Sequence, residues 1–271
     1  MQRQFDKCVM TPIVVVKLGG SAITDKSKDC TPRLRLIHKV ATELAGYNGP
    51  LVLLHGGGSF AHPFATPDLV NDMFSSERGL KSVSEIELNL DQLTRIVGVS
   101  LLLHKRFFVP IRPMSFMTLR NGYVRSCFLS PITHAVRSGM IPIIHGDLCV
   151  DEHGGFGVVS ADRIATLLGR KMSVSRVLFG CDVDGVYGGL RRTKVVREVN
   201  SSNHSSVLIG IKSSSSDSTG GMHGKVTEAL NLARSGVESI IFNLKDPKNL
   251  TRLLAGDQSI GTRFVRWTKK S

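Results

Sequence analysis

Short apolar runs recur along the chain, and stretches with helical spacing of apolar residues separate them. The runs cover residues 13–17, 50–54, 107–111, 141–145, 176–180 and 238–242. Strands that are apolar at every position are typical of a parallel sheet that helices cover on both faces. The pattern therefore predicts an α/β fold, a three-layer α/β/α sandwich with a mainly parallel central sheet.

Three of the intervening stretches have the spacing of amphipathic helices. Residues 33–46 end in a glycine, and residues 222–235 are followed by Gly236, the kind of residue that often terminates a helix. Residues 82–104 are long enough for one helix or for two shorter ones. We therefore expect at least three helices of ordinary length.

Two other stretches, residues 62–80 and the serine-rich residues 201–219, are predicted to be irregular, and the second to be a flexible surface loop. A boundary between two lobes is expected near residue 172. Gly169-Arg170-Lys171 closes one helix there before the next strand begins, so the chain divides into residues 1–172 and 173–271.

The net charge of +13 favours an anionic partner, such as nucleic acid, an acidic membrane surface or a phosphorylated small molecule. Nucleic acid is disfavoured because aromatic residues make up only 6% of the chain and the basic residues are dispersed. No apolar run approaches the roughly 20 residues that cross a bilayer. The N-terminal residues lack the apolar segment of a secretory signal, so a cytoplasmic location is expected. The five cysteines include no C-x-x-C pair and suggest neither disulfides nor zinc.

Two of the apolar runs end in consecutive glycines, within K-L-G-G-S at 17–21 and H-G-G-G-S-F-A-H at 55–62. Glycines after a strand expose backbone amides without a Cβ in the way, a geometry suited to phosphate oxygens. Taken singly, each motif has a simpler explanation. Lys17 would be a solvated lysine beside a tight turn, and His62 an ordinary surface or core histidine. Two such loops in one sheet favour a pair of phosphorylated ligands.

Four further motifs carry polar groups, namely H-G-D at 145–147, S-A-D-R at 160–163, D-V-D-G-V-Y at 182–187 and T-G-G-M-H-G-K at 219–225. Ser160 can cap the following helix, which leaves Asp162 either as a capping carboxylate or as a group that orients nearby lysines. The D-x-D-G segment lacks the other ligands of a calcium loop. Neither a Walker A motif nor G-x-G-x-x-G occurs.

The order of these six motifs, between about residues 13 and 263, resembles the amino acid kinase superfamily. Within it, His62 together with Thr24, Asp25 and Lys26 resembles the isopentenyl phosphate kinases. The resemblance implies ATP-dependent phosphorylation of isopentenyl phosphate by direct in-line transfer, in isoprenoid biosynthesis. It also implies a homodimer and Mg²⁺ accompanying ATP, held mostly by phosphate oxygens and without a metal site built from protein groups.

The same resemblance implies roles for single residues. Lys17 and Lys225 would bracket the transferred phosphoryl group, and Asp162 would orient them. Lys26 would stabilise charge in the transition state, and His62 would bind the acceptor phosphate. The residues assigned to ATP are Lys17, Gly19, Gly20, Ser21, Gly58, Asp182, Gly185, Tyr187, Gly220, Gly221 and Lys225, and those assigned to the acceptor are Gly56, Gly57, His62, Ser160 and Ala161.

The chain departs from the isopentenyl phosphate kinases at S-A-D-R, where they typically read S-G-D-D, so Ala161 and Arg163 are unusual. That change resembles fosfomycin kinase, which phosphorylates a phosphonate and also carries the glycine-loop histidine. A phosphonate kinase is therefore one alternative, and an ATP-binding regulatory protein without activity is another. An apolar acceptor tail would need apolar side chains within residues 68–102, where Leu69, Val70, Met73, Phe74, Ile86 and Leu90 are available.

Overall fold

The computed structural model describes residues 11–64, 76–188, 194–212 and 221–267, and within them a central sheet dominates the fold. Its strands are β1 (Ile13–Leu18), β2 (Leu51–His55), β3 (Phe108–Pro110), β6 (Ile141–His145), β9 (Val174–Cys181), β12 (Glu198–Val199), β13 (Glu238–Asn243) and β14 (Thr262–Phe264). They are arranged in the order β12-β14-β13-β9-β1-β2-β6-β3. All pairs are parallel except β13 with β14. Each of the six predicted apolar runs forms one of these strands.

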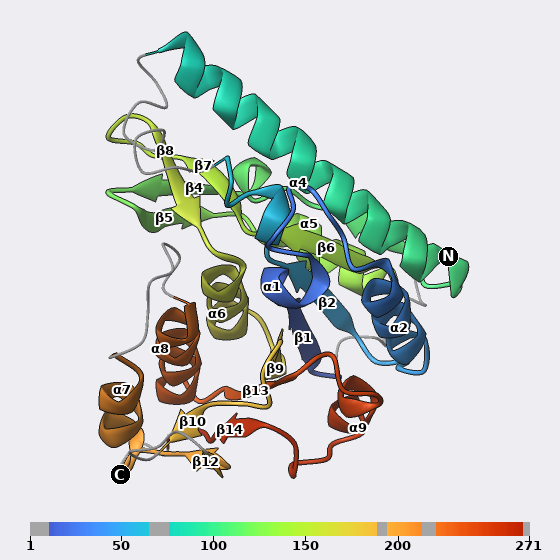
Figure 1. Cartoon of the computed structure of the whole chain (residues 1–271), viewed down its shortest axis with the longest axis vertical. Coiled ribbons are helices and arrows are strands. Elements are labelled where there is room, and N and C mark those ends of the chain that lie inside the picture. The colour runs from blue at the N-terminus through green and yellow to red at the C-terminus, as the bar shows by residue number, and fades with distance from the viewer. Residues whose placement is uncertain (1–10, 65–75, 189–193, 213–220, 268–271) are drawn as a thin grey trace.

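Helices cover both faces of the sheet, so the predicted three-layer sandwich is confirmed (Figure 1). Val14 and Val16 of β1 point to one face, while Val15 points to the other, and all three are buried. The helices on the first face are α2 (Leu34–Ala45), α4 (Glu77–Leu103) and α9 (Asn249–Leu254), and those on the second are α5 (Ser130–Arg137), α6 (Ala161–Lys171), α7 (His204–Lys212) and α8 (Gly221–Arg234).

Short elements complete the edge of the sheet where the central strands end. Two hairpins, β4 (Met117–Arg120) with β5 (Tyr123–Cys127) and β7 (Asp147–Val150) with β8 (Phe156–Val159), lie beside the N-terminal half of α4 (Figure 1). The remaining elements are α1 (Gly20–Ile23), η3 (Gly58–Phe60), η4 (Pro113–Ser115), β10 (Tyr187–Gly188) and β11 (Lys194–Val195).

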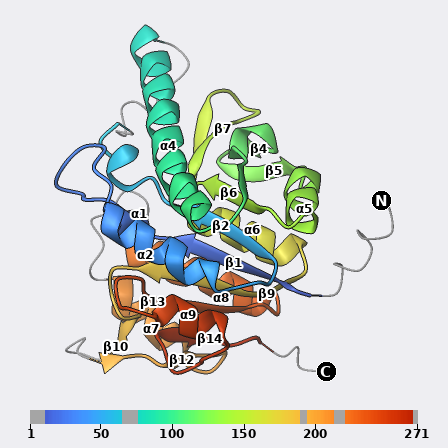
Figure 2. The same ribbon diagram turned by 90° about the vertical axis from the view of Figure 1, so that its right-hand side faces the viewer.

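The predicted helical stretch 82–104 forms one long helix, α4, and not two shorter ones. This helix projects beyond the sheet (Figure 2). It begins at Glu77 because the Ser76 side chain accepts a hydrogen bond from the Gly79 amide at 3.1 Å, an N-cap. Residues 77–80 are therefore helical, and the prediction of an irregular segment 62–80 was wrong there. Residues 65–75 lie outside the described part of the chain.

The prediction of a flexible loop at 201–219 was also wrong over residues 204–212, which form α7. The serine-rich composition suggested a loop, but Val207 and Ile211 lie one helical turn apart and are both buried in the core. Burial of this apolar stripe stabilises a helix that composition alone disfavours. Residues 213–219 are outside the described ranges.

Within the described ranges, no helix is long and apolar enough to cross a membrane. The four cysteines described there, Cys30, Cys127, Cys149 and Cys181, are all free thiols, in line with the expectation of no disulfide framework.

Candidate active site

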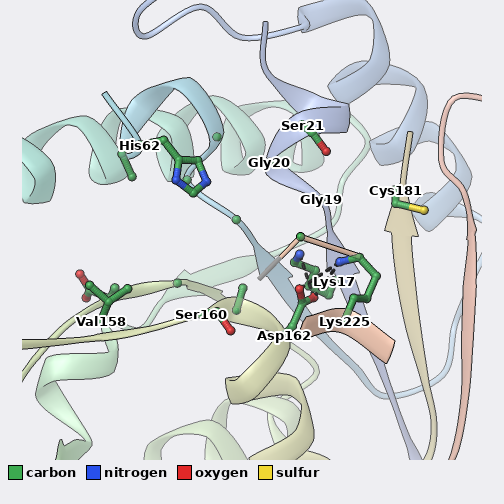
Figure 3. Close-up of a pocket in the computed structure, with 18 of the residues that line it drawn as sticks. Lys17, Gly19, Gly20, Ser21, His62, Val158, Ser160, Asp162, Cys181 and Lys225 are labelled. Carbon is green, nitrogen blue, oxygen red and sulfur yellow. Dashed lines mark hydrogen bonds and ion pairs between the residues drawn. The ribbon is translucent and has the colours of Figure 1, made fainter. Parts of the chain in front are cut away.

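Four neighbouring strands end at the same level of the sheet, and the polar motifs follow directly after them. The parallel register pairs Leu18 with His55 and with Gly180, and His55 with His145. The loops after β1, β2, β6 and β9 are therefore brought together at the carboxyl edge, the usual site for ligands in open α/β sheets. A cavity of about 360 Å³ lies there and is lined by residues from all four loops (Figure 3).

The two glycine loops pack backbone against backbone. A Cβ on Gly20 would lie 2.5 Å from the Gly58 nitrogen, and a Cβ on Gly58 would lie 2.1 Å from the Thr24 Oγ1. Gly58 also has φ +55, a conformation that side chains disfavour. Thr24 holds both loops, since its hydroxyl donates to the Gly20 carbonyl at 2.8 Å and accepts from the Ser59 amide at 3.0 Å. Larger side chains would separate the loops.

This packing leaves backbone amides available at the cavity. Among the described residues, no main-chain oxygen accepts from the amides of Gly20, Ser21, Gly57 and Gly58, all of which line the cavity. Unsatisfied donors at a concave surface favour anionic oxygens. Each glycine loop therefore contributes amides that are free to bind an anion in the cavity, and their role as a phosphate cradle stays a prediction.

Lys17 and Lys225 meet on a single carboxylate. Lys17 Nζ lies 2.8 Å from Asp162 Oδ1, and Lys225 Nζ lies 3.0 Å from Asp162 Oδ2. Lys17 comes from the end of β1, Asp162 from the first turn of α6, and Lys225 from α8. Ser160 caps α6 by accepting from the Arg163 amide at 3.2 Å, as predicted. Capping is thus done by Ser160, and Asp162 contacts the two lysines instead (Figure 3).

Burial and charge shift the pKa values in this Lys-Asp-Lys cluster in opposite directions. Burial lowers the pKa of Lys17 to about 8, with a further lowering by Lys225, although Asp162 opposes both. Burial alone would raise the pKa of the Asp162 carboxyl, but the two ammonium groups outweigh it and hold that pKa well below its usual range. Asp162 is therefore an anion at neutral pH, and Lys17 is a cation that loses its proton unusually easily.

The titration of Lys17 predicts that activity declines at alkaline pH. Lys17 is charged below its pKa of about 8 and loses its charge as the pH rises through that value. For the ATP substrate that the resemblance implies, we expect kcat/KM, measured at saturating acceptor, to fall about ten-fold per pH unit above about pH 8. This ratio is the one to measure because it reports ionisations of the enzyme before ATP binds. A profile that stays flat between about pH 7 and pH 10 would contradict the role of Lys17.

The end of the cavity opposite the Lys-Asp-Lys cluster has an apolar wall. His62 and Lys26 are exposed residues that line the cavity, and His62 lies across it from the Lys-Asp-Lys cluster (Figure 3). Ile86 and Leu90 of α4 line this end and pack with Leu148 of β7 in a small apolar cluster. The cavity thus combines cations, amides and an apolar end.

Comparison of the sequence with known protein families identifies the family of this chain. A sequence model of the amino acid kinase family matches residues 12–243. The chain belongs to the amino acid kinase family. This result, together with the observed layers, confirms the predicted amino acid kinase fold.

Individual members of the family are similar over nearly the whole chain. The isopentenyl phosphate kinase of Methanothermobacter thermautotrophicus is 30% identical over 93% of this chain and 99% of its own length. That of Methanocaldococcus jannaschii is 26% identical over 90% of this chain and 96% of its own length. A solved structure of isopentenyl phosphate kinase, 28% identical, matches with a TM-score of 0.78 over 93% of this chain and 100% of that chain.

The two unusual residues of this amino acid kinase have different environments. Arg163 points away from the cavity, since its guanidinium donates to the Gly122 carbonyl at 2.7 Å and lies 5.1 Å from the centre of the Tyr123 ring. Arg163 does not line the cavity, whereas Ala161 does. Of the two unusual residues, Ala161 is therefore the one that can contact a molecule bound in the cavity.

The described structure brings most of the predicted site residues to the cavity but not all. Asp182 lines it and accepts a hydrogen bond from the Ser21 hydroxyl at 3.3 Å. Gly185 and Tyr187 are not lining residues, and the Tyr187 hydroxyl donates to Asp184 at 3.1 Å. Gly220 lies outside the described residues. The predicted residues that line the cavity are Lys17, Gly19, Gly20, Ser21, Lys26, Gly56, Gly57, Gly58, His62, Ser160, Ala161, Asp162, Asp182, Gly221 and Lys225.

Several lining residues have no role in the sequence-based prediction. Leu148 and Val158 reach the cavity from the β7–β8 hairpin, and Met222 reaches it from α8. Asp147 is visible in the sequence as part of H-G-D, but nothing in that motif indicates that this residue forms part of the cavity wall. The position of the hairpin depends on tertiary packing, so no local signal identifies Leu148 or Val158.

Proposed function

We propose that the protein is a kinase that transfers a phosphoryl group from ATP to isopentenyl phosphate, releasing ADP and isopentenyl diphosphate for isoprenoid biosynthesis. One observation carries the proposal: a single cavity joins the Lys-Asp-Lys cluster and the amide cradle to an apolar end with His62 on its rim. An acceptor with a phosphate and a short apolar tail matches that combination. The isopentenyl phosphate kinases among its relatives support the same acceptor.

The proposed chemistry needs positioning and charge neutralisation more than a base. The acceptor oxygen of a phosphate monoester is already largely deprotonated near neutral pH. The main cost is bringing two anions together, and Lys17, Lys225 and Lys26 offset it as the phosphoryl group passes in line from donor to acceptor. Asp162 holds Lys17 and Lys225 side by side, and the glycine amides bind phosphate oxygens. No covalent enzyme intermediate is required.

We also propose that Mg²⁺ enters with ATP. Among the described residues, no group of three or more His, Cys, Asp or Glu side chains is placed to hold a metal ion. That arrangement fits a Mg²⁺ bound mostly by triphosphate oxygens and waters, as is usual for this ion. Asp182, which lines the cavity beside Ser21, is the carboxylate we expect to contact its water shell. Bound in this way, Mg²⁺ neutralises part of the triphosphate charge.

A panel of acceptors tests the proposal. Purified protein with Mg-ATP should release ADP with isopentenyl phosphate and much more slowly with fosfomycin, because Ile86, Leu90 and Leu148 offer an apolar surface that the smaller phosphonate cannot fill. Turnover of fosfomycin without turnover of isopentenyl phosphate would assign the site to a phosphonate kinase. ATP binding with no transfer to any acceptor would instead indicate a regulatory protein.

His62 provides a second prediction. Replacing His62 with alanine removes a donor to the acceptor phosphate, so KM for isopentenyl phosphate should rise about ten-fold or more while KM for ATP changes little. Steady-state kinetics with each substrate varied in turn measures both. His134→Ala, which removes an exposed histidine on α5, is the control. A change in KM for ATP alone would show that the assignment of His62 to the acceptor is wrong.

The homodimer remains a proposal that rests on the family resemblance, as do the roles of the two lobes, acceptor binding and dimerisation for residues 1–172 and nucleotide binding for residues 173–271. The cytoplasmic location and the boundary at residue 172 remain proposals that rest on the residue pattern. Sedimentation velocity at micromolar concentration tests the homodimer directly, with a mass twice that of the chain as the expected result.

A further inference from the structure

Two carboxyl groups face each other where α4 packs against β7, in the wall of the cavity. They belong to Glu87 of α4 and to Asp147 at the start of β7, and each is close enough to influence the protonation of the pair. Asp147 is buried, and the Glu87 side chain is only 15% exposed. The other oxygen of each group already has a donor: Asp147 Oδ1 accepts from the Leu148 amide at 2.7 Å, and Glu87 Oε2 accepts from Arg112 Nη1 at 3.2 Å.

The two oxygens that remain have no hydrogen-bond donor in the described residues. Asp147 Oδ2 and Glu87 Oε1 are both buried and both lack a partner that could donate to them. Two oxygens of this kind in contact repel each other if both groups are ionised, and a single proton between them satisfies both. The aspartic proteases contain a carboxyl pair that shares a proton for the same reason.

We infer that Asp147 and Glu87 share one proton, which Asp147 Oδ2 donates to Glu87 Oε1. This proton prevents a second negative charge in the wall at the acceptor end of the cavity, and the hydrogen bond it forms joins β7 to α4. Burial, then the hydrogen bond and charge of Glu87, raise the pKa of Asp147 to about 9. The proton is assigned to Asp147 because Arg112 lies 3.2 Å from Glu87 Oε2 and has no contact with Asp147 among the described ion pairs.

The surrounding groups leave the proton in place. The charge of Arg112 is already shared by Glu87 and Asp91 on α4. His145 Nδ1 lies 3.7 Å from Asp147 Oδ2, too far for a hydrogen bond, and burial lowers the pKa of this histidine so that it is neutral. The remaining titratable groups nearby are neutral at the same pH, since burial raises the pKa of Cys149 to about 12 and lowers that of His55 to about 3.

The position of the pair connects it to acceptor binding, and this step rests on the proposed function. Asp147 lines the cavity, and its neighbour Leu148 packs with Ile86 and Leu90, which flank Glu87 on α4. Loss of the shared proton places a second negative charge in that wall. The new charge repels Glu87 and also repels a phosphate acceptor, which is a dianion above about pH 7. Asp147 is therefore a positioning residue for the acceptor.

The variant Asp147→Asn tests the inference, because its amide donates to Glu87 at every pH. Between about pH 7 and pH 10 we expect KM for isopentenyl phosphate to rise about ten-fold more in the parent than in the variant, because only about one tenth of the Asp147 groups keep the proton one pH unit above a pKa of about 9. Lys17 titrates in both proteins, so its contribution cancels in the comparison. Glu85→Gln is the matched control, since Glu85 lies on the same helix, has a side chain that is 45% exposed, and pairs with Lys81 at 3.7 Å without lining the cavity.

Infrared spectroscopy of the parent provides a readout that does not depend on any acceptor. A protonated carboxyl group absorbs as a carbonyl stretch, separate from carboxylate bands. The parent should show this band at about pH 7.5 and lose it above about pH 10, and Asp147→Asn should lack it. Absence of the band in the parent overturns the inference even if isopentenyl phosphate is turned over.

The kinetic outcomes are equally decisive. Parallel pH profiles in the parent and Asp147→Asn would overturn the link to acceptor binding. If isopentenyl phosphate is not turned over at any pH, the proposed function fails and the acceptor role fails with it, while the infrared band still decides whether the proton is shared.

Discussion

Replacing Asp162 with asparagine should lower kcat about 10²- to 10³-fold at saturating ATP and isopentenyl phosphate. The substitution removes the carboxylate that holds Lys17 and Lys225 at 2.8 and 3.0 Å and leaves two ammonium groups facing each other. One of them then gives up its proton, because Asp162 is the charge that opposes burial in setting the pKa of Lys17. The site loses both a cation and the spacing between the two cations.

The same variant has a kinetic signature that simple unfolding would not produce. The decline of kcat/KM for ATP at alkaline pH should begin at a lower pH, because without Asp162 the pKa of Lys17 falls further below about 8. Asp257→Asn, which removes a carboxylate paired with Arg252 away from the cavity, serves as the control. If Asp162→Asn keeps kcat within a few-fold of the parent, and kcat/KM for ATP declines over the same pH range, Asp162 is only a structural group.

Replacing Lys26 with alanine should lower kcat about 10²-fold while leaving the protein folded and KM for ATP nearly unchanged. Lys26 is an exposed residue on the rim of the cavity, so its loss creates no buried void. Its proposed interaction is with charge that develops on the transferred phosphoryl group, and such an interaction contributes to kcat more than to ground-state binding. Single-turnover rates at saturating substrate measure the effect on the transfer step.

The chain offers a matched control for this variant. Lys28 is exposed in the same loop but does not line the cavity, so Lys28→Ala removes an equal charge from nearly the same surface. It should keep kcat within about two-fold, because exposed charges are screened by solvent. Equal losses in Lys26→Ala and Lys28→Ala would point to a general field effect instead of a specific contact.

The residue pattern alone predicts the sheet, its layers and the glycine loops. Residues 13–16 are apolar on both faces, as a strand buried between two layers of helices requires, and each of the six runs forms a strand. Ser160 caps α6 as predicted because a cap depends on a few neighbouring residues. Where composition and local apolar spacing disagreed, composition was the poorer guide, as the serine-rich α7 shows.

Tertiary structure alone decided which polar groups meet and which way they point. Lys17, Asp162 and Lys225 form one cluster only because β1, α6 and α8 converge at the same edge of the sheet. Arg163 follows Asp162 directly, yet its side chain points to the β4–β5 hairpin, so Ala161 lines the cavity and Arg163 does not. The contact between Glu87 and Asp147 likewise depends on how α4 docks. Sequence patterns report local conformation and burial, whereas the meeting of charged groups depends on the packing of elements that are far apart in the chain.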